Sequence, residues 1–341
     1  FSFSALDCAG AASLTRPIRS AAPAFLGQPL PAPAEEPAAV LTLDELTSFF
    51  EHPARYLLRR RLGIDLGARG PDLPDREPVA LSGLDRYRIG DRLLAIDLAG
   101  VSPDSIATVL RAAGHLPVGS PGECALADLA AIAEPLSRRL HELRDGRPAP
   151  LSIDGTLIDG TRLAGQLDEV WERGPVVGQF ARVNGRHLLS LWIRHLAYCW
   201  QLERGAGAIA GQSFLVGRGA DEEDGIVEAR LRPVAQPGRL LSDLVALQRL
   251  GQREPLRLIP KVAYRYARAI RQRGDDRQSQ ALATARRELA DEHAEDPHLG
   301  RAFAGPGALV GSDEPGSSSA SFEALARRVF DPLLDHLDEG R

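Results

Sequence analysis

The spacing of apolar positions changes several times along the chain, and each change predicts a different kind of element. From residue 42 to 62 the apolar residues recur at helical spacing, with Thr42 and Glu45 placed as a Thr-x-x-Glu capping box. Pro53 breaks or restarts this helix, because proline lacks the backbone donor that a helix interior needs. Residues 81–146 also have mostly helical spacing.

The spacing becomes strand-like from residue 149. Three runs, 149–159, 161–171 and 175–183, are separated by Asp159-Gly160 and Arg173-Gly174, which are favourable hairpin turns. Helical spacing returns over 187–202, and two further strands are expected at 209–217 and 226–234. The chain from 238 onward is predicted to be helical, apart from a flexible loop at 305–321. This alternation predicts an α/β layer architecture.

Two segments define the expected domain organisation. Residues 1–40 are rich in Ala and Pro and have neither helical nor strand periodicity, so they are interpreted as a linker from an upstream region. Residues 41–341 are expected to form one domain with a helical C-terminal part.

Composition and charge narrow the class of protein. The chain has 341 residues, of which 44% are hydrophobic, and no apolar run reaches the length of a membrane span. Its net charge of −5 argues against a protein that coats nucleic acid through bulk charge. Cys8, Cys124 and Cys199 are widely spaced, which predicts three free thiols in a reducing cytoplasm and neither a zinc site nor a disulfide framework.

Short motifs in a fixed order carry a family resemblance. They are Leu43-Asp44-Glu45-Leu46, His52-Pro53, Arg59-Arg60-Arg61-Leu62, Gly83-Leu84-x-x-Tyr87, Arg111-Ala112-Ala113-Gly114-x-Leu116-Pro117-x-Gly119, Leu191-Trp192-x-x-His195-Leu196-x-Tyr198-Cys199, Gly251 and Pro255-Leu256. In order and spacing, the chain resembles the C-terminal part of RecC, the gamma subunit of the bacterial exodeoxyribonuclease V (RecBCD) helicase–nuclease. The motifs extend over nearly all of residues 41–341.

The resemblance implies a restriction-endonuclease-like, PD-(D/E)xK core, with a mixed sheet flanked by helices and the catalytic residues lost. Active relatives have a Gly-x-Ile-Asp strand followed by a Val-Asp-x-Lys strand. Asp168 fits the first strand, but Gly178 stands at the carboxylate position of the second and Phe180 at the lysine position. Glu123 is a further acidic candidate. Because cleavage needs two carboxylates for Mg²⁺ and a lysine, we expect no catalysis and no metal here.

Purely structural roles also explain these acidic residues. Asp168 is explained as well by a carboxylate that accepts backbone N–H groups, and Glu123 by a first-turn acid that the helix dipole favours. His187 and His195 lie two helical turns apart, but without acidic or Cys neighbours at ligand spacing they favour a structural role over a metal pair.

A basic run interleaved with aromatic residues is the candidate DNA contact. It consists of Lys261, Tyr264, Arg265, Tyr266, Arg268 and Arg271. Arginine pairs with phosphates and tyrosine stacks on bases, although a solvated helix face explains the run nearly as well. A second cluster, Arg55 with Arg59, Arg60 and Arg61, lies at a helix end, where cations also suit the dipole.

The resemblance implies a cytoplasmic, non-catalytic DNA-handling and scaffold domain in double-strand break repair. Its partners would be RecB- and RecD-type subunits, DNA forks and single strands, and no membrane. This domain would hold no cofactor, whereas the partner subunits would use Mg²⁺ and ATP. Loops around 217–226 and 305–321 are candidates for a strand-splitting element on length only. The alternatives are an active Mg²⁺ nuclease with a migrated site, or a purely structural partner-docking domain.

Overall fold

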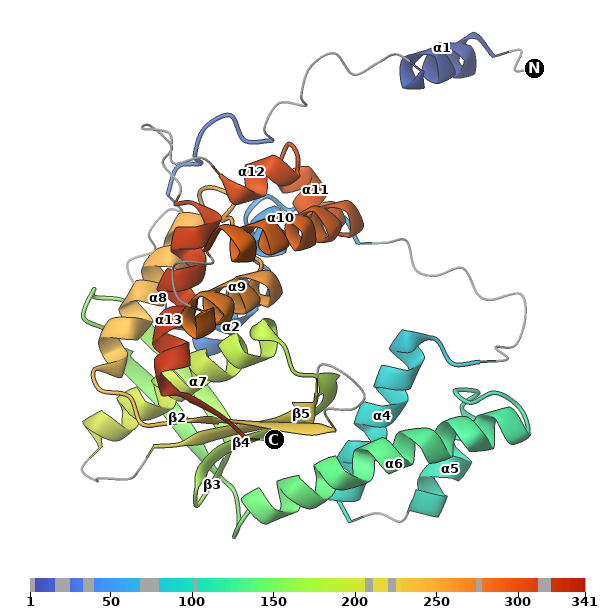
Figure 1. Cartoon of the computed structure of the whole chain (residues 1–341). Coiled ribbons are helices and arrows are strands. Elements are labelled where there is room, and N and C mark those ends of the chain that lie inside the picture. Colours follow the sequence, from blue (N-terminus) through green and yellow to red (C-terminus); the bar gives the residue numbers. More distant parts are fainter. Residues whose placement is uncertain are drawn as a thin grey trace.

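Within the residues that the computed structural model describes, seven strands form one mixed sheet with helices on both faces (Figure 1). The described residues are 4–15, 25–32, 40–67, 80–100, 103–205, 211–219, 225–273, 278–311 and 320–340. The strands are β1 (Val40–Thr42), β2 (Ala149–Thr156), β3 (Arg162–Trp171), β4 (Gly174–Arg182), β5 (Ser213–Arg218), β6 (Ile226–Leu231) and β7 (Leu337–Gly340). The predicted mixed α/β class is confirmed.

The helices follow the sequence prediction in number and order over most of the chain. They are α1 (Ala5–Leu14), α2 (Leu43–Glu51), α3 (Pro53–Tyr56), the π-helix η1 (Leu57–Arg61), α4 (Gly83–Leu98), α5 (Pro103–Ala112), α6 (Ser120–Leu143), α7 (Gly185–Arg204), α8 (Pro237–Gly251), α9 (Pro260–Arg273), α10 (Gln278–Glu295), α11 (Pro297–Ala302), α12 (Pro306–Val310) and α13 (Phe322–His336). No helix in the described part of the chain combines the length and the apolar character needed to cross a bilayer.

The sheet order is β1-β3-β4-β5-β6-β7, with β2 on the other edge of β3. β4 and β5 are parallel, so the chain must cross over between them, and α7 is that crossover. β3 and β4 form a hairpin that pairs at only two positions, Val170 with Pro175 and Trp171 with Gly174. Beyond the turn the two strands separate, and β4 continues beside β5.

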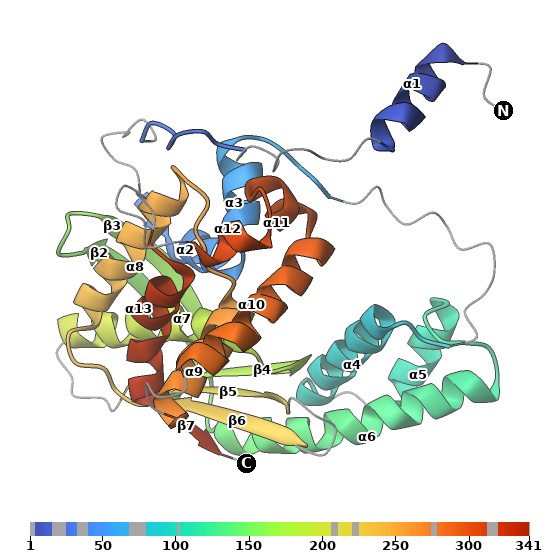
Figure 2. The same cartoon turned by 45° about the horizontal axis from the view of Figure 1, so that its top comes forward.

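Alternating side chains of β5 contribute to two separate cores. Leu215 belongs to the larger core, which contains α2, α7, α8, α9 and α13. Phe214 and Val216 point to the opposite face and pack in a second core with α4 and α6. Because successive strand residues face opposite sides, helices cover β5 on both faces. In Figures 1 and 2, α4, α5 and α6 form a helical unit at one side of the sheet, away from α8.

The predicted start of the first domain helix is confirmed. Thr42 Oγ1 accepts a hydrogen bond from the Glu45 backbone N–H at 3.1 Å, and Glu45 Oε2 accepts one from the Thr42 N–H at 3.0 Å. These two bonds satisfy donors that the helix leaves free, as a capping box does. Pro53 ends this helix as expected, and α3 begins there.

Three local predictions were wrong. The segment 1–40, where no helix was expected, contains α1, whose described side chains are exposed and whose Ala-rich sequence has high intrinsic helix propensity; the interpretation of the segment as a linker stays a prediction. The loop expected at 305–321 contains α12. Residues Leu337–Gly340, in the part of the chain predicted to be helical, pair with β6 as β7, and no local spacing encodes a pairing between such distant segments. Positions 220–224 and 312–319, within the two candidate strand-splitting loops, lie outside the described residues.

Candidate functional site

Asp168, the candidate first ligand, lies on β3 with an exposed side chain. Its Oδ1 accepts a hydrogen bond from the Gln166 side-chain amide at 2.7 Å. The strand that would carry the second carboxylate, β4, has already separated from β3 at this level. Among the described residues, Asp168 belongs to no group of side chains whose ligand atoms converge as a metal requires.

Gly178, which the resemblance predicts at the position of the second carboxylate, faces a packed helix. A Cβ on Gly178 would lie 2.9 Å from Leu140 Cδ2 and closer still to Cδ1. Leu140 comes from α6 and is fully buried in the second core. Gly178 itself offers no metal ligand. The space that an aspartate side chain would need at this position is also filled by α6.

Phe180, which the resemblance predicts at the lysine position, is a fully buried core residue. Its ring packs against α4 at Gly90, where even a Cβ would overlap the ring. The Arg218 guanidinium lies over this ring, 5.1 Å from its centroid. The position is shaped for an aromatic ring and has no room for a solvated ammonium group, which is costly to bury unpaired.

Glu123 lies in the first turn of α6 and is exposed, with Arg111 at 3.8 Å. Leu140, which covers Gly178, lies 17 residues further along the same helix, or about 25 Å at 1.5 Å per residue. Glu123 therefore cannot share an ion with the β4 positions. The four family positions occupy different places and do not form one site.

The basic run on α9 is paired with acids from the neighbouring helices. Lys261 Nζ donates to Glu292 Oε1 at 2.7 Å, and Arg265 Nη1 donates to Glu288 Oε1 at 3.1 Å, both acids being on α10. Arg271 Nη1 donates to Asp335 Oδ1 on α13 at 2.6 Å. These ion pairs are partly exposed and individually weak, but they neutralise the charge that a phosphate would need.

The tyrosines of the run are buried, which is at odds with stacking on bases. Tyr264 packs on Phe330 with a ring separation of 5.8 Å, and Arg268 lies over its ring at 5.9 Å. Tyr266 is 2% exposed, and its hydroxyl donates to Glu323 at 3.5 Å. Both rings sit on the inward face of α9, so a base could reach them only if the core opened.

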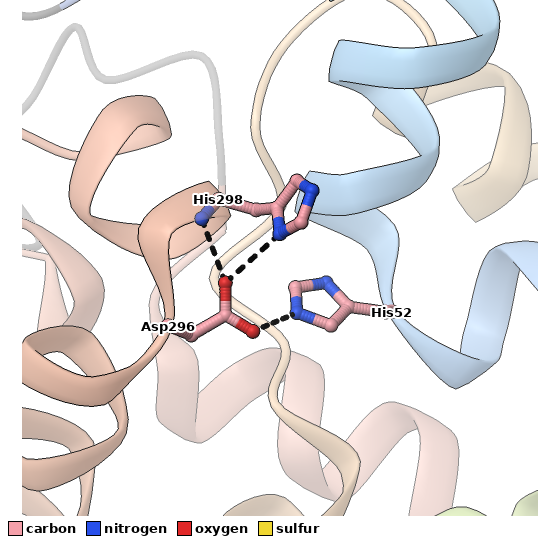
Figure 3. A group of neighbouring side chains, drawn as sticks. All are labelled: His52, Asp296 and His298. Carbon is pink, nitrogen blue, oxygen red and sulfur yellow. Dashed lines mark hydrogen bonds and ion pairs between the residues drawn. The ribbon is translucent and has the colours of Figure 1, made fainter. Parts of the chain in front are cut away.

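A side-chain cluster that the sequence did not single out joins α3 to the start of α11 (Figure 3). It consists of His52, Asp296 and His298, whose candidate ligand atoms lie within 4.8 Å of one another. His52 and Asp296 are 244 residues apart, so no motif spacing links them. The local signal was Asp296 before Pro297, an N-cap residue followed by proline at the first helical position.

The hydrogen bonds of His52 identify which ring nitrogen carries the proton. Its Nδ1 accepts a bond from the Arg55 backbone N–H at 3.1 Å, so this nitrogen is unprotonated. The proton is then on Nε2, which donates to Asp296 Oδ2 at 2.7 Å. A metal-binding histidine normally donates through its second ring nitrogen, whereas His52 accepts there.

The Asp296 carboxylate is already occupied. Its Oδ1 accepts bonds from the backbone N–H groups of His298 and Leu299 and from His298 Nδ1, and its Oδ2 accepts the bond from His52. Burial acts to raise the pKa of Asp296, but these hydrogen bonds outweigh it and hold the pKa well below its usual range. His298 Nε2 is buried without a hydrogen-bond partner among the described residues. The cluster is therefore a proton-bearing clamp between two helices and fits a metal ion poorly.

His195 and His187, considered above as a metal pair, have separate environments. The buried His195 donates through Nε2 to the Arg232 carbonyl at 2.9 Å, and Ser213 Oγ donates to its Nδ1 at 2.9 Å. Burial lowers the pKa of His195 to about 4, which keeps the ring neutral. His187 also has its pKa lowered to about 4, mainly by burial.

Comparison with known proteins identifies the family. The RecC C-terminal domain model matches residues 38–271, which is more than half of the chain. The chain belongs to the RecC family. The RecBCD enzyme subunit RecC of Mycolicibacterium smegmatis is 33% identical over 284 residues, covering 82% of this chain and 25% of that protein. The proteins of the same name from Mycobacterium tuberculosis and Escherichia coli are 31% and 30% identical, over 91% and 69% of this chain. They are covered over 28% and 20% of their own length, so the chain spans about a quarter of these relatives.

Proposed function

We propose that this RecC-family chain is a non-catalytic scaffold and DNA-handling domain of a RecBCD-type helicase–nuclease that acts in double-strand break repair. The observation that carries the proposal is the packing of Leu140 over Gly178 and of Phe180 against Gly90. These contacts fill the space that a catalytic carboxylate and lysine would need. The names of the relatives, all RecC subunits of RecBCD enzymes, support the assignment to such a complex.

In this proposal the fold is a restriction-endonuclease-like core whose catalytic positions became structural. The hairpin of β3 and β4, the crossover helix α7 and the parallel strand β5 support this interpretation. Asp168 is then a surface residue, and Phe180 holds α4 on the sheet. The motor and cutting chemistry, with Mg²⁺ and ATP, belongs to RecB- and RecD-type partner subunits, and the complex works on DNA forks and single strands in the cytoplasm.

An active nuclease with a migrated site receives little support. Lys261 is the only lysine of the sequence, and it is paired with Glu292 on the α9–α10 face. No group of acidic ligands within the described part of the chain gathers around Asp168. Metal-dependent cleavage would need both a second carboxylate and a cation close to the scissile phosphate.

A purely structural, partner-docking role is the second candidate, and one observation favours it. The α9 run expected to contact DNA has its cations paired and its tyrosines buried. The DNA handling proposed above therefore uses a surface other than α9. Forked-DNA binding by the assembled enzyme with and without this domain's surface arginines would distinguish the two roles.

The test of the proposed function is the Asp168→Ala variant in the assembled enzyme. We expect unchanged rates of DNA unwinding and degradation, because Asp168 is exposed and holds no metal in this proposal. The isolated chain, shown to be folded by circular dichroism, should cut neither single- nor double-stranded DNA in Mg²⁺ or Mn²⁺. Metal-dependent cleavage that disappears in Asp168→Ala would refute the proposal.

A further inference from the structure

The helical unit of α4, α5 and α6 has a cavity that no role described above uses. The cavity has a volume of about 200 Å³. It is lined by Asp85, Arg88, Ile89, Arg92, Leu110 and His115. The first four come from α4, Leu110 from α5 and His115 from the residues just after α5. In Figures 1 and 2 this unit lies at one side of the molecule, away from α8.

Two arginines of this cavity lack an acidic partner. Arg88 and Arg92 are one helical turn apart on α4, so their guanidinium groups reach the same side of the helix. Neither forms an ion pair with any residue that the structure describes, in contrast to Lys261, Arg265 and Arg271 on α9. The one acid in the lining, Asp85, accepts a hydrogen bond from Ser82 Oγ at 2.6 Å, within the N-cap of α4.

Apolar side chains are also exposed on the helical unit that holds the cavity. Of the eight large hydrophobic residues that are exposed in the described structure, four lie on α4, α5 and the loop that follows. They are Leu84, Tyr87, Val109 and Val118. The floor of the cavity, Ile89 and Leu110, is also apolar. Leu84 lies one helical turn before Arg88, so an exposed apolar side chain borders the arginines of the cavity, a combination typical of protein–protein hot spots.

The charge around the cavity favours a single carboxylate over a nucleic-acid strand. The sequence from Gly83 to Leu143 contains eight Asp and Glu but only six Arg and no Lys. A DNA backbone presents a row of phosphates and needs a row of cations along its path. Here two arginines without an ion pair in the described structure line one cavity, within a unit that is acidic as a whole. One buried acidic side chain, held by two arginines, fits that distribution.

We propose that this cavity receives an Asp or Glu side chain from another subunit of the same enzyme, and that the apolar neighbours of that residue cover Leu84, one helical turn before Arg88. This inference rests on the proposed membership of a RecBCD-type complex. The carboxylate accepts hydrogen bonds from Arg88 and Arg92, and the apolar contacts exclude water around the pair. A charge pair that is desolvated in this way contributes more to affinity than an exposed one.

The test compares charge reversal inside and beside the cavity in the full-length subunit. Arg88→Glu with Arg92→Glu should weaken binding of the purified RecB- and RecD-type subunits at least about 30-fold, because the incoming carboxylate would meet like charges. Arg86→Glu is the matched control. It reverses one charge on the same helix without lining the cavity, and it should change the dissociation constant by no more than about threefold. Unchanged melting temperatures would show that the variants fold.

A second experiment identifies the residue that enters the cavity. A photo-cross-linking amino acid at Leu84, in the assembled complex, should capture a partner segment that contains Asp or Glu beside apolar side chains. Replacing that acid by Arg should restore binding to the Arg88→Glu, Arg92→Glu subunit.

The outcomes separate this inference from the proposed function. Failure of the unaltered subunit to bind its partners would overturn the proposed function itself. Equal affinities of the unaltered subunit and the double variant would overturn only the assignment of the cavity. Loss of forked-DNA binding with intact assembly would also overturn it, and would assign the cavity to nucleic acid.

Discussion

Adding a methyl group at Gly178 tests the packing that excludes a catalytic carboxylate. In Gly178→Ala the new Cβ would lie 2.9 Å from Leu140 Cδ2 and 3.2 Å from Leu140 Cγ. Leu140 is fully buried among α4, α6, β4 and β5, so it has no free space to rotate into. Overpacking of a core by one carbon costs about 1–3 kcal/mol. Replacing a glycine within a strand by alanine lowers the conformational entropy lost on folding, which stabilises the fold by up to about 1 kcal/mol. We expect net destabilisation of about 1–2 kcal/mol.

A double-mutant cycle with Leu140→Ala isolates this contact. Leu140→Ala alone should cost about 2–5 kcal/mol, because it leaves a cavity in the second core. The cavity then accommodates the methyl group that Gly178→Ala adds, so the two substitutions together should destabilise by less than the sum, by about 1–3 kcal/mol. Urea denaturation followed by tryptophan fluorescence measures each free energy of unfolding.

A glycine with free space around it provides the control for Gly178→Ala. Gly83→Ala, at the start of α4, places its Cβ where no atom lies within 4 Å, so it should be neutral or slightly stabilising. Additivity of Gly178→Ala and Leu140→Ala within about 0.5 kcal/mol would refute the contact. The same packing predicts that Gly178→Asp with Phe180→Lys unfolds the domain and does not restore cleavage, since both new charges would be buried without partners.

Substitutions of three buried or hydrogen-bonded side chains, His195, His52 and Tyr266, give further predictions. The pKa of His195 in the folded chain, about 4, lies below its unfolded value of about 6.5, so the unfolded state binds the proton first. Stability from this group is complete above pH 6.5 and falls by about 3 kcal/mol toward pH 4; in His195→Asn, chemical denaturation over this range should show a shallower pH dependence. His52→Ala should cost about 1–3 kcal/mol through the lost cap and the Asp296 bond, whereas neither EDTA nor Zn²⁺ should shift the melting temperature; a Zn²⁺-dependent rise would contradict the clamp. Tyr266→Ala should destabilise the fold by about 3–5 kcal/mol; weaker DNA binding at unchanged stability would instead support base stacking.

The sequence by itself determined the elements whose signals are local. Thr42 and Glu45 are three residues apart, so their spacing alone predicts the capping box that the structure contains. Asp159-Gly160 predicted a turn that the structure contains, with Gly160 at a φ of 84°, a conformation that glycine adopts easily. The motif order also identified the family, and the prediction that Gly178 and Phe180 stand at former catalytic positions came from the sequence alone.

Only the tertiary structure decided what surrounds those residues. Glycine at 178 was visible in the sequence, but its cover by Leu140 depends on where α6 packs. The α9 cations looked available for phosphate until the fold placed Glu292 and Asp335 beside them. The clamp of His52 with Asp296 joins residues 244 positions apart. Side-chain spacing reports contacts within a few residues, whereas these contacts arise from packing between helices that are distant in the chain.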